Sequence, residues 1–255
     1  MKKLTSDNRK RLIKAAAVLF WLAVWAAAAA LLGQELLIPG PVPVLTRLAA
    51  LAATGAFWVK VAFSLLRVLG GFAAGAALGI LFAALSFRFA LFEAVAEPVI
   101  RVGKSTPVAS FIILIMLWIR SGSVPLAVSL IVVLPVIYFS VLEGLRATDG
   151  GLLEMAAVFR FSLPKRLRLI YGPSVRPFLY PALLSGLGLA WKSGIAAEVL
   201  ALPLRSVGSQ IYYAKIYLET VDLFAWTAVI VLLSLLIEKL LALAVGGKGG
   251  GVRED

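Results

Sequence analysis

The sequence predicts an all-α integral membrane protein with six transmembrane helices, and two observations carry this prediction. Of the 255 residues, 62% are hydrophobic and the mean hydropathy is +1.00, whereas about half of a soluble domain is apolar. The 25 Lys and Arg residues outnumber the 13 Asp and Glu residues, and they gather at the ends of apolar runs. That distribution is typical of membrane spans separated by charged connections.

The composition also excludes several classes of function. Cys and His are both absent, which excludes thiol nucleophiles, disulfides, histidine bases and His/Cys metal sites. A net charge of +12 raises nucleic acid as a partner, but the cations do not form one patch interleaved with aromatic residues. We therefore predict a lipid bilayer, and no nucleic acid, as a partner of the chain.

The first segment combines a basic tail with an apolar run. Residues 1–14 are rich in Lys and Arg and directly precede the apolar residues 15–33, which predicts a cytoplasmic N-terminus. A signal peptide is the alternative interpretation. The IPGPVPV segment that follows predicts an extended external link, because proline fixes φ and lacks an N–H. Residues 45–53 predict a surface helix after that link.

Three glycines mark the second apolar run, residues 61–86. Gly71, Gly75 and Gly79 lie four residues apart and therefore share one face of a helix, a ridge that lets another helix approach closely. The ridge predicts close helix packing within one subunit; a contact between two copies is the alternative.

The charged residues 87–105 are predicted to be a cytoplasmic connection. Their VGKST ending, completed by Thr106, resembles the end of a phosphate-binding loop, but Pro98 stands where that loop requires glycine. No nucleotide site is therefore predicted. Residues 106–119 predict a short third span, and residues 124–142 predict a fourth span that Pro135 should kink.

A strongly basic island, residues 150–177, separates the fourth and fifth spans. Its apolar residues recur at spacings of three and four: Leu152, Met155, Val158 and Phe159. This spacing predicts a short helix over residues 152–161 with one apolar face. Ser162 is expected to cap a second turn that has Pro164 near its start. The island should form a helix-turn-helix at the membrane surface whose apolar stripe needs a partner.

Two charged residues lie within the fifth apolar run, residues 178–201. A lysine at the depth of Lys192 costs about 2.5–3.5 kcal/mol on insertion scales, so it should face protein or a wet cavity. It is a functional-site candidate; a structural ion pair or snorkelling to the membrane surface is the alternative. Glu198 lies near the outer end and is predicted to be an interface residue. Six positions place the two side chains about 120° apart on a helix, so they are not expected to pair.

Residues 202–222 predict a second external stretch. Its tyrosines suit a membrane-interface belt, with a substrate contact as the alternative. Residues 223–245 predict the last span, and the glycine-rich residues 246–255 predict a flexible tail. With six spans, most cations fall on the side of the N-terminus, so both termini are predicted to be cytoplasmic.

The island and its neighbours resemble the permease subunit of ATP-binding-cassette importers, in the nitrate, sulfonate, taurine and bicarbonate branch. The family's cytoplasmic loop pattern of a glutamate and alanine, a glycine, and a closing Leu-Pro maps here to Glu154, Ala156 with Ala157, Arg160 in place of the glycine, Ser162, and Gly172 with Pro173 in place of the closing pair. Residues 186–200 and 64–83 also resemble that branch, and the likeness spans about residues 61–245. Where the family has glycine, the break after Ser162 is expected to supply the turn.

The resemblance implies a type I importer permease fold at the cell membrane, in three parts. Residues 1–60 would hold the basic tail, first helix and external link, residues 61–245 the permease domain with its coupling loop at 146–177, and residues 246–255 the tail. The resemblance implies docking of an ATPase by Glu154, Met155, Ala156, Ala157, Val158, Phe159, Arg160 and Ser162. It implies a translocation pathway lined by Trp191, Lys192, Ser193, Gly194 and Glu198.

The resemblance further implies a transport subunit and not an enzyme. The chain would bind no cofactor or metal itself, and a separate ATPase would use the ATP. An extracytoplasmic binding protein would deliver a small, anionic solute, and a second copy of the chain would complete the pathway. An ion-coupled secondary transporter is the main alternative, but it needs buried acids and usually an internal repeat. An integral-membrane enzyme needs a cluster of catalytic groups that the sequence does not supply.

Overall fold

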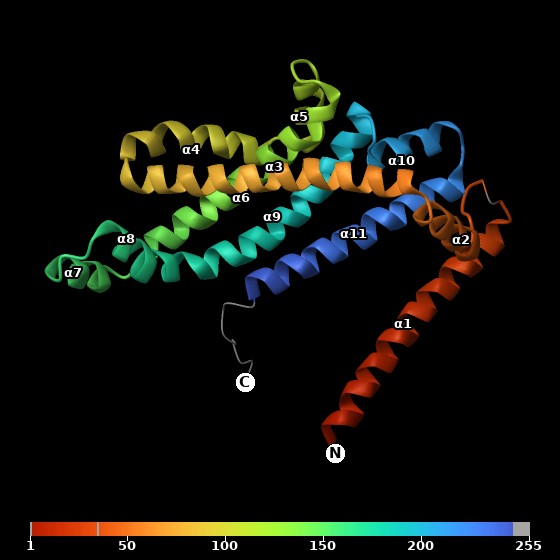
Figure 1. The fold of residues 1–255 in the computed structure, drawn as a ribbon, viewed down its shortest axis with the longest axis horizontal. Coiled ribbons are helices and arrows are strands. Elements are labelled where there is room, and N and C mark those ends of the chain that lie inside the picture. The colour runs from red at the N-terminus through yellow and green to blue at the C-terminus, as the bar shows by residue number, and fades with distance from the viewer. Residues whose placement is uncertain (1, 35, 247–255) are drawn as a thin grey trace. The chain divides into compact units, whose positions relative to one another are not determined.

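The structure is a computed structural model that describes residues 2–34 and 36–246, and within them every regular element is a helix. The helices are α1 (Lys2–Leu32), α2 (Pro41–Ala52), α3 (Gly55–Arg88), α4 (Ala90–Ser105), α5 (Val108–Met116), η1 (Ser121–Ser123), α6 (Val124–Arg146), α7 (Gly150–Val158), α8 (Leu163–Arg166), η2 (Leu167–Tyr171), α9 (Gly172–Ala201), α10 (Val207–Ile216) and α11 (Thr220–Gly246). Figure 1 shows their order along the chain. The all-α prediction is confirmed.

Five helical stretches of the described chain are long and apolar enough to cross a membrane. They are Ala15–Leu32, Gly55–Arg88, Ser121–Arg146, Leu163–Ala201 and Thr220–Ala244. A sixth span is reached if α4 and α5, which meet at a bend of 105°, are taken together. The six predicted spans agree with this larger count, and the cytoplasmic side of the termini stays a prediction.

The third span differs from its prediction. Residues 106–119 were expected to cross the membrane as one short helix, but α5 has only 9 residues and is about 14 Å long, less than half of the ~30 Å hydrocarbon core. Most of the charged residues before it, which were predicted to be a cytoplasmic connection, form the helix α4. The break lies at Thr106 because the residue before a proline, here Pro107, disfavours the helical region.

The chain forms two compact units. The first contains the described residues up to Val59 together with Gln210–Val231. In it, Trp25 donates a hydrogen bond from its indole nitrogen to the carbonyl oxygen of Pro39 at 3.0 Å, and Arg47 donates two to the carboxylate of Asp222 at 2.5 and 2.7 Å. These hydrogen bonds raise the pKa of Arg47 above its ordinary value, because they favour the charged form.

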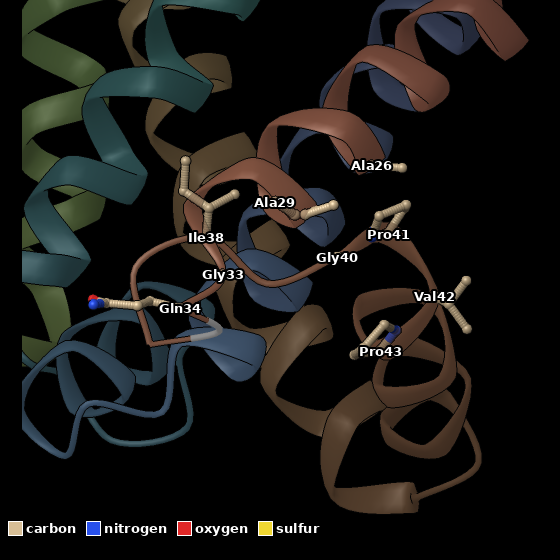
Figure 2. A pocket seen from close by; sticks show the side chains of 10 residues that line it. Ala26, Ala29, Gly33, Gln34, Ile38, Gly40, Pro41, Val42 and Pro43 are labelled. Atoms are coloured by element: carbon tan, nitrogen blue, oxygen red, sulfur yellow. The ribbon is translucent and has the colours of Figure 1, made fainter.

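The extended link predicted for the IPGPVPV segment is shorter than expected, because only residues 38–40 of that segment lie outside a helix. Pro41 and Pro43 lie in the first turn of α2, after Gly40 at the N-cap position. Proline is tolerated there because the first turn of a helix has no partners for its N–H groups. A hollow of about 400 Å³ lies between the end of α1 and this turn (Figure 2), and Gln34 supplies a polar side chain to its otherwise apolar lining.

The second unit contains Lys60–Ser209 and the described residues from Leu232 onward. Its centre is the pair α6 and α9, which run side by side (Figure 1). The glycine ridge of α3 packs on α6: a Cβ atom at Gly75 would lie 2.7 Å from the carbonyl oxygen of Leu130, and one at Gly79 would lie 2.9 Å from Cβ of Ile137. The predicted packing of this ridge within one subunit is confirmed.

Candidate docking helix and translocation helix

The helix α7 begins with a side-chain cap. Asp149 occupies the N-cap position, and its carboxylate accepts a hydrogen bond from the backbone N–H of Gly151 at 2.7 Å. Such a cap satisfies an N–H that has no partner inside the helix. The helix therefore starts at Gly150, two residues before the start that the apolar spacing predicts.

The helix ends in a turn centred on Arg160. The N–H of Phe161 bonds to the carbonyl oxygen of Ala156 at 2.8 Å, and the N–H of Arg160 bonds to that of Ala157 at 3.1 Å. This pair of bonds is the Schellman motif, in which the residue after the C-cap adopts a left-handed backbone conformation. Arg160 has φ 49°, a conformation that costs a residue with a side chain about 1–2 kcal/mol.

The sequence prediction misplaced this turn. The break after Ser162 was expected to replace the missing glycine, but the chain turns at Arg160 itself. Ser162 does occupy the N-cap position of α8, with Pro164 in the first turn, yet its side chain makes no capping hydrogen bond. Backbone hydrogen bonds of the Schellman motif form the turn, and they do not require glycine. Glycine only lowers the free-energy cost of the left-handed residue.

Two side chains of α8 fasten the corner between α7 and α8. Arg166 donates a hydrogen bond from Nε to the carbonyl oxygen of Phe161 at 3.1 Å. Lys165 places Nζ 3.8 Å from the centroid of the Phe161 ring, within the range of a cation–π interaction. Phe161 therefore links the end of α7 to the start of α8.

The predicted docking residues lie mostly on the surface. Ala156 is fully buried, so it fixes the inner face of α7. The others are exposed, and Val158 and Phe159 keep 78% and 68% of their surface accessible. These two consecutive residues therefore expose apolar surface at the end of a capped helix, and contiguous exposed apolar surface often marks an interaction site.

The predicted pathway residues of α9 lie on different faces. Trp191, Ser193 and Gly194 are buried, whereas Lys192 is exposed. A Cβ atom at Gly194 would lie 2.7 Å from Oγ of Ser129, which shows that α9 approaches α6 closely there. Lys192 therefore stands on the side of α9 that the described chain leaves uncovered.

Glu198 is not the interface residue that its position predicts, because its side chain is 0% exposed. The carboxylate accepts hydrogen bonds from Oγ of Ser64 at 2.7 Å and from the N–H of Gly208 at 3.0 Å. The guanidinium of Arg67 lies 3.4 Å from its other oxygen. Groups of the same chain thus enclose the carboxylate, which does not face an open pathway in this conformation.

The same cluster holds the link between α9 and α10. Arg67 donates hydrogen bonds to the carbonyl oxygens of Leu204 at 2.8 Å and Arg205 at 3.3 Å. Ser64 accepts one from the N–H of Val207 at 2.9 Å, at the start of α10. Burial of an ionised carboxylate is tolerated only with such a set of partners. The sequence prediction missed the partners of Glu198. Arg67 could have pointed to them, because a cation within an apolar run is a signal to look for an opposite charge.

The described residues contain no group of three or more Asp or Glu side chains that could hold a metal ion. The VGKST residues do not form a loop that leads into a helix. Most of them belong to the last turn of α4, with the segment ending at Thr106. A phosphate-binding loop instead precedes a helix and presents its N–H groups.

Comparison with known proteins identifies the family. The family model for the inner membrane component of binding-protein-dependent transport systems matches residues 75–244. The chain belongs to this family. All the predicted docking and pathway residues lie inside the matched part, and the permease is a multi-pass protein of the inner membrane.

Similar permeases are named for different substrates. A putative aliphatic sulfonates transport permease protein of Escherichia coli is 30% identical over 72% of this chain and 70% of its own length. The taurine transport system permease protein of the same organism is 26% identical, over 84% of this chain and 80% of its own. The riboflavin transport system permease protein of Chloroflexus aurantiacus is equally similar, at 26% over 84% and 80%.

Proposed function

We propose that this permease is the membrane-spanning subunit of an ATP-driven importer and that α7 docks it onto a separate ATPase. The observation that carries the proposal is the exposed apolar pair Val158 and Phe159 at the end of a short helix with a side-chain cap at its start. An amphipathic helix that enters a groove of its partner is a recurrent mode of protein recognition. The partner's groove would take the apolar pair.

The proposed docking also assigns roles to the other subunits of the importer. Closure of two ATPase subunits around ATP would move two copies of α7, and each copy would pass the movement to its own membrane helices. A homodimer would place the uncovered sides of two α9 helices, with Lys192, along a shared pathway. The permease would bind no cofactor itself, and an extracytoplasmic binding protein would deliver the solute.

A small organic anion of the sulfonate class is the proposed solute. Two relatives named as taurine and aliphatic sulfonates transport permeases support this class, and a lysine exposed in a membrane helix favours an anion. The riboflavin relative shows that family membership alone does not fix the solute. The positive charge of Lys192 is therefore the feature of this chain that favours an anionic solute.

Docking can be tested with Val158→Asp and Phe159→Asp in one variant. Two carboxylates would be desolvated in an apolar groove, so co-purification of the ATPase with the permease should be lost while the permease still reaches the membrane. Leu204→Asp with Leu218→Asp is the matched control, because both leucines are exposed and lie outside α7. Equal recovery of the ATPase with both variants would contradict docking through α7.

The solute class can be tested by uptake of labelled taurine into membrane vesicles. Lys192→Gln should lower uptake about tenfold, the factor for ~1.4 kcal/mol, at an unchanged amount of permease. Lys192→Arg keeps the positive charge and should retain most of the uptake. If the glutamine variant transports taurine like the unmodified protein, Lys192 does not act on the solute.

A further inference from the structure

The membrane span that follows the corner is longer than a bilayer. Leu163–Ala201 is continuous over 39 residues, or about 58 Å at 1.5 Å per residue, whereas the hydrocarbon core is ~30 Å thick. It also has the lowest mean hydropathy of the five candidate spans. A large part of it must therefore lie outside the hydrocarbon core. Its basic first part, Leu163–Arg176, is the part that fits the headgroup region.

The first part of this span mixes exposed cations with exposed leucines. Lys165, Arg168 and Arg176 are exposed, and so are Leu163, Leu167 and Leu169, at 68%, 53% and 53%. The side chains of Arg168 and Arg176 make no ion pair or hydrogen bond within residues 2–34 and 36–246, the part of the chain that the structure describes. The segment itself contains no acid. Its surface therefore needs both an apolar and an anionic environment.

We infer that Leu163–Arg176, here called the anchor segment, binds anionic lipid headgroups. Its leucines would enter the boundary between headgroups and acyl chains, and its cations would contact the phosphates, as amphipathic basic segments do at membrane surfaces. An acidic protein surface would match the cations as well. It does not explain why the segment is continuous with a membrane span.

The anchor segment would also position α7. The bonds of Phe161 to Lys165 and Arg166 connect the docking helix to the first turn of the segment. Lipid bound to the segment would therefore limit the angles at which α7 meets its partner. Lipid binding itself does not depend on the proposed ATPase docking, so the two can fail separately.

The test measures lipid preference next to the anchor segment in the full-length protein. The chain holds no Cys, so Pro173→Cys, at an exposed site, gives one position for a fluorescent label. The labelled permease is placed in nanodiscs that contain brominated phosphatidylglycerol or brominated phosphatidylcholine at equal mole fraction. Quenching of the label reports which lipid lies beside it.

Brominated phosphatidylglycerol should bind beside the label about fivefold more strongly at low salt, which is the factor for ~1 kcal/mol from a cation near an anionic surface. Arg168→Gln with Arg176→Gln should reduce this preference, and so should high salt. Arg120→Gln with Lys215→Gln removes the same charge from exposed sites elsewhere and should leave it unchanged.

Equal quenching by the two lipids in the labelled protein would overturn the inference. So would a preference that the Arg168 and Arg176 variant keeps in full. If that variant instead weakened ATPase binding in phosphatidylcholine alone, the cations would serve an acidic protein, which also overturns lipid binding.

Discussion

Two corners of the permease contain residues with a left-handed backbone conformation, but different contacts hold them. At the end of α7, Arg160 has φ 49°, and at the end of α9, Leu202 has φ 50° and Arg205 has φ 54°. The link after α9 is held by side chains from α3, because Arg67 and Ser64 bond to its backbone. The turn after α7 is held by its own backbone hydrogen bonds and by the contacts of Phe161 with Lys165 and Arg166 of the next helix.

The difference suggests different mechanical roles. Left-handed residues persist where surrounding contacts over-determine them, as the Glu198 cluster does for the α9–α10 link. The α7–α8 corner has fewer such constraints and presents its apolar residues outward. We expect the α9–α10 link to stay fixed during transport and the α7–α8 corner to adjust when a partner binds. Substitutions at the two corners should therefore differ in size and in sign.

The largest expected effect comes from Glu198→Ala. The substitution leaves the largely buried guanidinium of Arg67 without its counter-ion and removes the acceptor from Gly208. Breaking a buried pair in this way costs about 3–5 kcal/mol, or a fall of ~6–20 °C in the unfolding temperature for a chain of this size. Thermal unfolding of the purified permease in detergent measures it.

Glu143→Ala is the control for this substitution, because Glu143 is an exposed carboxylate in α6. Its removal should change the free energy of unfolding by less than about 0.5 kcal/mol. A Glu198→Ala protein as stable as the control would mean that the cluster does not hold the α9–α10 corner.

Much of the fold was readable from the sequence because apolar length and cation placement depend on the bilayer and not on tertiary detail. The spans around Gly75, Pro135 and Lys192 were found in this way. The bend between α4 and α5 was not found, because the apolar run after Pro107 looked like one span. The helical start of α2 was missed because Pro41 suits an extended link and a first helical turn equally well.

The candidate site was predictable where it depends on local spacing and unpredictable where it depends on distant partners. The apolar spacing around Val158 predicted α7 with an error of a few residues. The burial of Glu198 could not be read from its own neighbours, because its partners lie on α3 and at the start of α10. The same limit applies to Arg160, whose φ follows from hydrogen bonds that periodicity does not show.

A smaller effect is expected from Arg67→Lys, which keeps the charge beside Glu198. The guanidinium reaches the carboxylate and two backbone carbonyls at once, whereas a lysine ammonium is a compact point charge. At least one of the three contacts should be lost, at a cost of about 1–2 kcal/mol. Thermal unfolding should place this variant between the unmodified protein and Glu198→Ala. Stability below that of Glu198→Ala would show that geometry matters more than charge at this corner.

The smallest expected effect, and the only stabilising one, comes from Arg160→Gly. Glycine adopts φ 49° without the cost of about 1–2 kcal/mol that a side chain adds, but it loses more backbone entropy on folding, about 0.5–1 kcal/mol. The turn should therefore become about 0.5–1 kcal/mol more stable. Hydrogen exchange at the N–H of Phe161, which bonds to Ala156, should slow about two- to fivefold.

Arg160→Ala removes the same guanidinium but keeps the strained backbone, so hydrogen exchange at Phe161 should not slow in this variant. Leu202→Gly should give no comparable gain, because it also removes a half-buried leucine from a link that the Glu198 cluster already holds. If glycine and alanine at position 160 slowed exchange equally, the charge of Arg160 and not its φ would set the stability of the docking corner.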